Sequence, residues 1–306
     1  MTNLIVANRK WLHKKSAFLL AAVVLAAICT GVFFYANFDY WQKPYLDSEI
    51  PDTSALADVL REKEQETEAI EEQVQTYNET ATALSSKENE FVEGCNSFAK
   101  AYFFENYGVD ISEKIATLTV QKVIYPEDIS QMVGGSFYPE KPNHLFINAD
   151  WFYLSDYDAR GTDYSATALR NVYVHELMHF LGFHSGLGMN YFTEAVAESL
   201  TERIMNDASL PYERMTGYAG IQQYASDFIE CDPEFIRGVL SDGCFDLKGR
   251  IDTQIGAAYS DYYNLLIGSV QHNGDRALQY RAKHITYEYC KASDANFAIM
   301  PPAFHR

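Results

Sequence analysis

His175-Glu176-Leu177-Met178-His179 is the segment that decides which fold and which chemistry are expected of this chain of 306 residues. On a helix, two histidines four residues apart lie on one face, one turn above the other. Both imidazoles can then reach a single zinc ion, at roughly 2.0–2.1 Å each. Glu176 projects beside them, where its carboxylate can take a proton from a zinc-bound water. We therefore expect His175 and His179 to be zinc ligands and Glu176 to be a catalytic base.

The residues before this segment favour a helix. Asp163 or Ser165 can cap its start. Apolar residues then lie on or near one stripe, as on a helix that packs against a core: Ala166, Leu169, Val172, Leu177 and Phe180. The alternative is a buried helix whose two histidines are merely hydrogen-bonded.

A catalytic zinc ion needs three protein ligands and one open position. A glycine-containing turn is expected from Gly182 to Gly188, and a second helix is expected to begin after it, at Asn190. Glu194 and Glu198 lie one turn apart on this helix. One carboxylate can bind the metal, while the other accepts a hydrogen bond from a ligand imidazole and fixes its tautomer. Paired glutamates on a helix can also form a solvated face.

Together the two helices resemble those of the gluzincin metallopeptidases, the group that contains thermolysin and the membrane alanyl aminopeptidases. These families pair His-Glu-x-x-His with a later helix that bears Asn-Glu-Ala or Asn-Glu-Gly, whose glutamate is the third zinc ligand. The resemblance implies that Glu194 is this ligand and that Glu198 supports a zinc histidine. The chain departs from the pattern at Thr193, where asparagine is usual, and only 14 residues separate His179 from Glu194.

The resemblance also implies an α+β fold with the two lobes of a zincin, a mixed twisted sheet with the active-site helix and then a helical C-terminal lobe. The sequence favours strands ahead of the metal helix. Residues 117–125 are rich in β-formers, and residues 136–138 can pair with His144–Asn148 as a hairpin. In gluzincins an edge strand commonly binds the substrate backbone, and residues 134–137 or 144–146 are the candidates here.

A second resemblance leads to an alternative site. Residues 175–183 are similar to the astacin-type metzincin motif. Metzincins place a third histidine six residues after the second, where this chain has Ser185, and His184 lies one residue short of that position. They also have a methionine turn below the metal, for which Met215 and Met300 are available. A metzincin-like site that uses His184 therefore remains an alternative.

The N-terminal residues predict a membrane anchor. Residues 1–16 carry four basic and no acidic side chains, and residues 17–38 are uncharged, mostly apolar and long enough to cross a bilayer. Basic flanks stay in the cytoplasm, so the tail at 1–16 would be cytoplasmic and the chain from residue 39 onward would lie outside the cell membrane. A cleaved signal peptide is the alternative.

Residues 39–90 form an acidic, polar stretch behind this anchor. Apolar side chains recur in it at spacings of four and three residues, a heptad-like seam: Leu56, Leu60, Ile70, Val74, Tyr77, Ala81 and Leu84. The pattern suits a helical stalk, a coiled coil that makes a homodimer through residues 54–91, or a helix packed on the catalytic domain. Residues 91–306 would then form one zinc metallopeptidase domain, in which Phe98, Tyr102 and Phe103 suggest a helix ending near Gly108.

The net charge limits the class of partner, and the cysteine content is compatible with an exported domain. The net charge of −18 would repel nucleic acid, so we exclude nucleic-acid binding and expect a peptide or protein substrate. Four cysteines outside the anchor permit two disulfides in an exported domain: Cys95, Cys231, Cys244 and Cys290. Three pairings are possible, and the local choice is Cys231 with Cys244, which leaves Cys95 with Cys290.

The expected activity is that of a membrane-anchored, extracytoplasmic zinc metallopeptidase, which hydrolyses peptide bonds with a water activated by Glu176. Such an enzyme also needs a donor for the tetrahedral oxyanion. Tyr218, on a turn after the ligand helix, is our candidate, and its rivals are Tyr191, Tyr224, His272 and His284. The alternative function is that of a non-hydrolytic cell-surface binding or adhesion protein on the same scaffold. Glu176 argues against it, because a binding module needs no base there.

Overall fold

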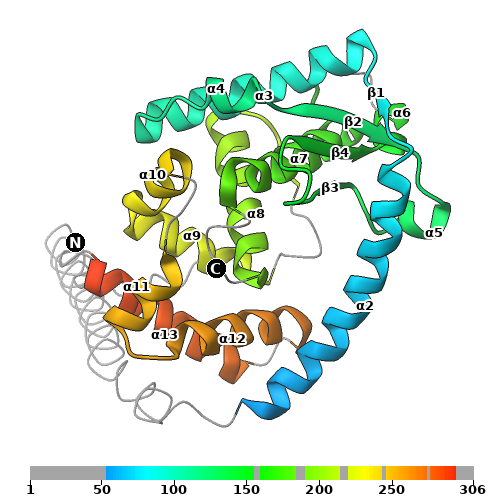
Figure 1. Ribbon diagram of the computed structural model, residues 1–306. Coiled ribbons are helices and arrows are strands. Elements are labelled where there is room, and N and C mark those ends of the chain that lie inside the picture. The colour runs from blue at the N-terminus through cyan, green and yellow to red at the C-terminus, as the bar shows by residue number, and fades with distance from the viewer. Residues whose placement is uncertain are drawn as a thin grey trace, which may run out of the picture. The chain divides into compact units, whose positions relative to one another are not determined.

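The computed structural model describes residues 53–154, 159–183, 190–213, 220–242, 246–273 and 276–293 (Figure 1). They belong to one compact unit, Ile50–Arg306, while Met1–Glu49 form the other unit of the chain. The expected tail at 1–16 and anchor at 17–38 therefore lie outside the described residues, as do the following single residues: His184, Met215, Tyr218, Cys244 and Met300. Within the described ranges, no helix combines the length and the apolar character needed to cross a bilayer.

The described residues form a mixed α+β structure, mostly helical with a small mixed sheet (Figure 1). The first part contains α2 (Ser54–Asn78), β1 (Thr82–Ala83), α3 (Ser86–Tyr107), α4 (Ser112–Ile115), β2 (Thr119–Val123), α5 (Glu127–Ser130), β3 (Gly135–Phe137), β4 (His144–Asn148) and α6 (Ala149–Leu154). The second part contains α7 (Tyr164–Met178), the π-helical turn η1 (His179–Phe183), α8 (Asn190–Asp207), α9 (Gln222–Cys231), α10 (Pro233–Asp242), α11 (Leu247–Gln254), α12 (Tyr259–Asn273) and α13 (Arg276–Ser293). The expected order, with strands before the helix that carries His175 and helices alone after it, is confirmed for the described residues.

The sheet has the strand order β1-β2-β4-β3. β2 and β4 are parallel, with Val120 opposite Leu145, whereas β3 and β4 are antiparallel, with Ser136 opposite Phe146. β1 is antiparallel to β2. The expected hairpin is thus confirmed. Of the two segments considered for an edge strand, residues 134–137 contain the edge strand β3, while residues 144–146 belong to β4 in the interior of the sheet.

Side chains that alternate along β4 give the sheet two buried faces. Leu145 and Ile147 point into the main core, to which α3 and α7 contribute. Phe146 points the opposite way, into a smaller cluster with Val123 of β2 and Val74 of α2. The sheet therefore lies between α7 on one face and the C-terminal half of α2 on the other.

α2 connects this second face to the helical part of the unit. Val74, near its C-terminal end, is buried against the sheet, and Leu60, near its N-terminal end, is buried as well. A Cβ atom on Gly268 of α12 would lie 3.1 Å from Cδ1 of Leu60, so the two helices touch there. Figure 1 shows α2 running from α12 to the sheet. Of the three arrangements considered for this region, residues 54–78 have that of a helix packed on the rest of the unit.

α3 is fixed at both ends and tied to the sheet. At its start, the Glu88 amide donates to Ser85 Oγ and the Glu88 carboxylate accepts from the Ser85 amide, a capping box. The same carboxylate pairs with Lys122 of β2 at 2.7 Å. The helix ends at Gly108, whose φ of 70° suits glycine, and this end agrees with the sequence.

Of the three possible cysteine pairings, the local choice of Cys231 with Cys244 is wrong. Cys231 at the end of α9 is bonded to Cys290 of α13, and their Cα atoms are 5.3 Å apart. Cys95 is a free, fully buried residue of α3, and burial raises the pKa of its thiol to about 12. A short loop favours closure between Cys231 and Cys244. Because α9 packs on α13, however, the partner of Cys231 is the more distant Cys290.

Candidate metal centre

α7 presents both histidines of the motif. It begins after Asp163, whose side chain accepts a hydrogen bond from the amide of Ala166 at 2.9 Å, so Asp163 is the cap. His175 lies in the last turn of α7, and His179 begins the π-helical turn η1. Gly182 then has a φ of 113°, a conformation that residues with a Cβ atom rarely adopt. The helix therefore stops one turn after the second histidine.

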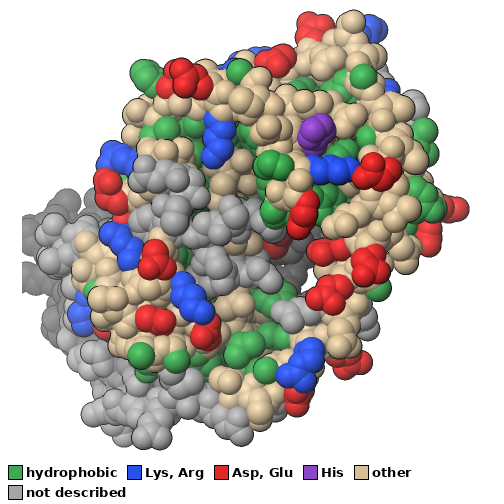
Figure 2. Space-filling view, in the orientation of Figure 1, with side chains coloured by type: hydrophobic (Ala, Val, Ile, Leu, Met, Phe, Trp, Pro, Cys, Tyr) green, Lys and Arg blue, Asp and Glu red, His purple; other side chains and the backbone are tan. Residues whose placement is uncertain are grey.

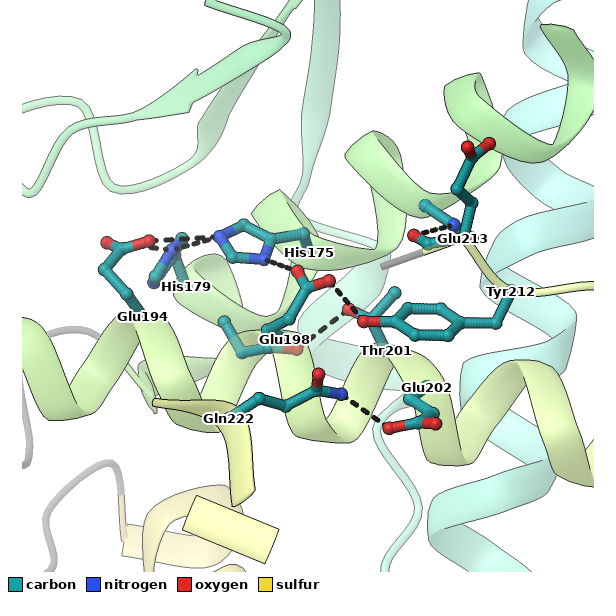
Figure 3. Close-up of polar contacts among 11 residues, drawn as sticks. His175, His179, Glu194, Glu198, Thr201, Glu202, Tyr212, Glu213 and Gln222 are labelled. Atoms are coloured by element: carbon teal, nitrogen blue, oxygen red, sulfur yellow. Dashed lines mark hydrogen bonds and ion pairs between the residues drawn. The ribbon is translucent and has the colours of Figure 1, made fainter. Parts of the chain in front are cut away.

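α8 brings two carboxylates to this pair of histidines. It starts at Asn190, as the sequence predicted, and carries Glu194 and Glu198. Its apolar side is fully buried, and it packs directly on α7: Phe192, Ala195, Val196, Leu200 and Ile204. This packing holds the polar side of α8 against the histidines of α7 (Figure 3).

His175, His179 and Glu194 converge on one point (Figure 3). The two imidazole Nε2 atoms are 3.2 Å apart. The Glu194 carboxylate lies 3.2 Å from Nε2 of His175 and 3.4 Å from Nε2 of His179. A tetrahedral zinc ion with bonds of 2.0–2.1 Å would hold its ligand atoms about 3.3 Å apart. The two nitrogens have this spacing, and each also has one oxygen of Glu194 at about this distance, Oε2 for His175 and Oε1 for His179. Two imidazoles and a carboxylate so placed could hold a zinc ion.

Among the described residues, the two histidines of the cluster are buried and Glu194 is partly exposed. The side chains of His175 and His179 are 5% and 6% exposed, whereas that of Glu194 is 26% exposed. A partly exposed ligand suits a catalytic metal, which must keep a coordination position for water or substrate.

Glu198 lies behind His175. Its Oε2 atom is 3.1 Å from Nδ1 of His175, and its side chain is fully buried. When Nδ1 donates its proton to Glu198, the lone pair of the imidazole is on Nε2 and faces Glu194. Glu198 thus has the position of a carboxylate that orients a ligand, and Glu194 has that of the ligand.

Electrostatics couple these groups tightly. Burial alone lowers the pKa of His175, but the hydrogen bonds to Glu194 and Glu198 raise it, and the resulting pKa is about 10. Burial raises the pKa of Glu194, but the charge of His179 and the bonds to both imidazoles hold it well below its usual range. A cation that binds Nε2 of His175 must therefore compete with a proton that Glu194 stabilises.

The edge strand β3 passes directly over Glu176. A Cβ atom on Gly135 would lie 2.6 Å from Cγ and 3.2 Å from Cδ of Glu176, so glycine is what permits this approach. Burial, and more weakly Glu194, raise the pKa of Glu176, while both imidazoles lower it, and the net pKa is raised. Strand β3 and the carboxylate of Glu176 thus share one side of the metal cluster.

One acidic residue of α2, Glu71, interacts electrostatically with Glu194 of the cluster. The pKa of Glu71 is raised, first by desolvation and then by the charges of Glu194 and Glu68. Figure 2 shows acidic side chains along the exposed face of α2. The surroundings of the site are therefore negative on the side of α2.

Two contacts that shape the site were not predicted from the sequence. Gly135 was expected only as part of a candidate edge strand, not as the residue that lies against Glu176, and no role was expected for Tyr212. The Tyr212 hydroxyl donates a hydrogen bond to Oε1 of Glu198 (Figure 3). Tyr212 lies in the irregular segment after α8 and is one of 22 tyrosines, so no spacing rule singles it out. Among the expected oxyanion donors, the Tyr224 hydroxyl is directed at the Gln279 carbonyl, 3.5 Å away.

Comparison with protein families, curated proteins and solved structures finds no match to this chain. The interpretation of the cluster therefore rests on its geometry and on the residues that form it.

Zinc content separates the roles of the two glutamates. Glu194→Ala removes one of three ligands and is expected to strip most of the zinc. Glu198→Ala leaves all three ligands and should weaken zinc affinity by a smaller factor, on the order of 10–100-fold. The measurement is metal analysis of the purified variants after dialysis against a graded series of chelator concentrations.

His184→Ala is the control for the metzincin alternative and should keep its zinc. If Glu198→Ala loses the metal while Glu194→Ala retains it, the two roles are inverted. If His184→Ala loses it, the third ligand is His184.

Proposed function

We propose that this protein is a membrane-anchored, extracytoplasmic zinc metallopeptidase with a zincin-like fold. The observation that carries the proposal is the meeting of Nε2 of His175, Nε2 of His179 and the Glu194 carboxylate within 3.2–3.4 Å of one another. Two imidazole nitrogens that face each other at this distance attract only through a shared proton or cation. A proton on Nε2 of His175 would also hold these groups together, so zinc content is the measurement that distinguishes a metal site from hydrogen-bonded histidines.

The chemistry of each group follows from its place. A zinc ion held by His175, His179 and Glu194 would polarise the scissile carbonyl and increase the acidity of the attacking water. Glu176 accepts the proton that this water loses and delivers it to the leaving amine nitrogen. Glu198 keeps His175 in the tautomer whose Nε2 can bind the metal. Tyr218 stays our candidate for the oxyanion donor.

Strand β3 supports a peptide as the substrate. An extended peptide can add to the edge of a sheet through its backbone, and β3 is an edge strand of the sheet formed by the described residues. Because Gly135 lies against Glu176, a peptide bound along β3 would run past the proposed base. This arrangement favours peptide hydrolysis over the chemistry of a small-molecule hydrolase.

The membrane anchor and the zincin-like fold rest on different observations. The anchor at residues 17–38 rests on its length, its lack of charge and the basic residues before it. The fold assignment is supported by the order of elements, a mixed sheet with an edge strand, then α7 with the histidines, then α8 with the glutamates. A binding or adhesion protein on the same scaffold would use the metal cluster without Glu176.

Glu176→Gln separates hydrolysis from metal binding. The amide is isosteric but accepts no proton, so zinc should stay at about one ion per chain while peptide hydrolysis falls by about 10²–10⁴-fold. Hydrolysis of a peptide library and zinc content are measured on the same preparation. Full activity in Glu176→Gln would remove this residue from its role, and a wild-type chain that binds zinc but cleaves no peptide would favour the binding protein.

The matched control is Glu213→Gln, the same chemical change in an exposed residue. Its side chain points away from the His175–Glu194 cluster (Figure 3), so both zinc content and hydrolysis should match the wild type.

Gly135→Ala tests the contact between β3 and the proposed base. The new methyl group would overlap Cγ of Glu176, so the carboxylate must swing away. A displacement of about 1 Å at a catalytic group can lower activity by about 100-fold, while the zinc ligands are untouched. We expect a large loss of hydrolysis with unchanged zinc content. In the control Gly134→Ala, the methyl group meets Val172 instead, 2.9 Å away, and should lower stability more than activity. Equal activity in the two variants would contradict the contact.

A further inference from the structure

Residues 211–213 make hydrogen bonds to both α7 and α8, the two helices of the candidate metal centre. Residues 211–213 follow α8 and carry no regular structure. From α7, Nη2 of Arg170 donates to the carbonyl of Pro211 at 3.2 Å, and Nδ2 of Asn171 donates to the carbonyl of Glu213 at 2.9 Å. Arg170 and Asn171 are both fully buried. The backbone on each side of Tyr212 is therefore fixed to the helix that carries the histidines.

The Tyr212 side chain completes this chain of contacts through Glu198. Its hydroxyl donates to Oε1 of Glu198, while Oε2 of the same carboxylate is 3.1 Å from Nδ1 of His175 (Figure 3). Each oxygen of Glu198 thus has its own partner. A fully buried carboxylate needs such donors, because leaving one of its oxygens without a hydrogen bond in the interior is costly.

Two donors on opposite oxygens also fix the orientation of the carboxylate. A glutamate side chain has three rotatable bonds, and the bond to His175 alone leaves the carboxylate free to turn about it. The hydroxyl of Tyr212, held by the anchored segment, removes this freedom. Oε2 then stays in line with Nδ1–H of His175, and Nε2 stays directed at His179 and Glu194.

We propose that Tyr212 is a positioning residue of the metal centre, which acts through Glu198 to fix the orientation and tautomer of His175. The inference rests on the proposed function, since it presumes that His175 binds a metal. It assigns to Tyr212 no contact with the metal or the substrate. Its effect must therefore appear in metal affinity, and it must depend on Glu198.

The test is a double-mutant cycle on zinc affinity, measured by competition with a chromophoric chelator on the full chain. Tyr212→Phe removes only the hydroxyl and should weaken zinc binding by about tenfold, at the lower end of what outer contacts of a metal site contribute. Glu198→Ala should weaken it by more. Tyr212→Phe in the Glu198→Ala background should then change zinc affinity little, since the hydroxyl has lost the group through which it acts.

The matched control is Tyr289→Phe. The Tyr289 hydroxyl also donates to a carboxylate, Oδ2 of Asp232, at 2.7 Å, but between α13 and the end of α9. This variant should lose thermal stability and keep its zinc affinity. Comparison with this variant therefore distinguishes a loss of zinc affinity from a loss of stability.

Three outcomes would overturn the role of Tyr212. The first is a zinc affinity of Tyr212→Phe equal to that of the wild type. The second is that Tyr289→Phe also loses zinc affinity, and by as much as Tyr212→Phe. The third is that Tyr212→Phe weakens zinc binding as much in the Glu198→Ala background as in the wild type. The readout does not use hydrolysis, so a chain that binds zinc without cleaving peptides would refute the proposed activity and leave the cycle on Tyr212 measurable. A wild-type chain that binds no zinc would refute both.

Discussion

A buried contact between His175 of α7 and Glu198 of α8 links the two helices that carry the candidate metal ligands. The two side chains are 5% and 0% exposed, and desolvating such groups costs several kcal/mol each unless they are paired. Removing one partner of a buried pair typically destabilises a protein by about 3–5 kcal/mol. The relative position of α7 and α8 must therefore keep these two side chains in contact. The buried apolar residues of α8 supply the packing that holds this position.

The surrounding elements position α7 from several sides. The Tyr173 hydroxyl donates to the Asn96 side chain of α3 at 2.7 Å, inside the core. Lys114 donates to the carbonyl of Leu181 at 2.5 Å, in the turn η1 that follows α7. A positive charge is favourable at the C-terminal end of a helix. β3 crosses the helix at Gly135, and α2 reaches from the sheet to α12. A rigid support of this kind is what a preorganised metal centre requires.

Local signals in the sequence predicted much of this arrangement. The cap at Asp163, the start of α8 at Asn190 and the hairpin of β3 and β4 each depend on residues close in sequence, and each is confirmed. Features that depend on tertiary packing were not predictable. The disulfide joins residues 59 positions apart, and the roles of Tyr212 and Gly135 follow from which side chains they meet in the fold. The heptad-like seam of α2 suits several kinds of helix packing, so its pattern alone did not select one.

We propose that one zinc ion binds between α7 and α8. Anomalous diffraction from crystals of the protein, recorded on both sides of the zinc absorption edge, would locate this ion. We expect one strong peak bonded to Nε2 of His175, Nε2 of His179 and the carboxylate of Glu194, at about 2.0–2.2 Å from each. A peak bonded to other side chains, or no peak at these three in a protein that hydrolyses peptides, would contradict it.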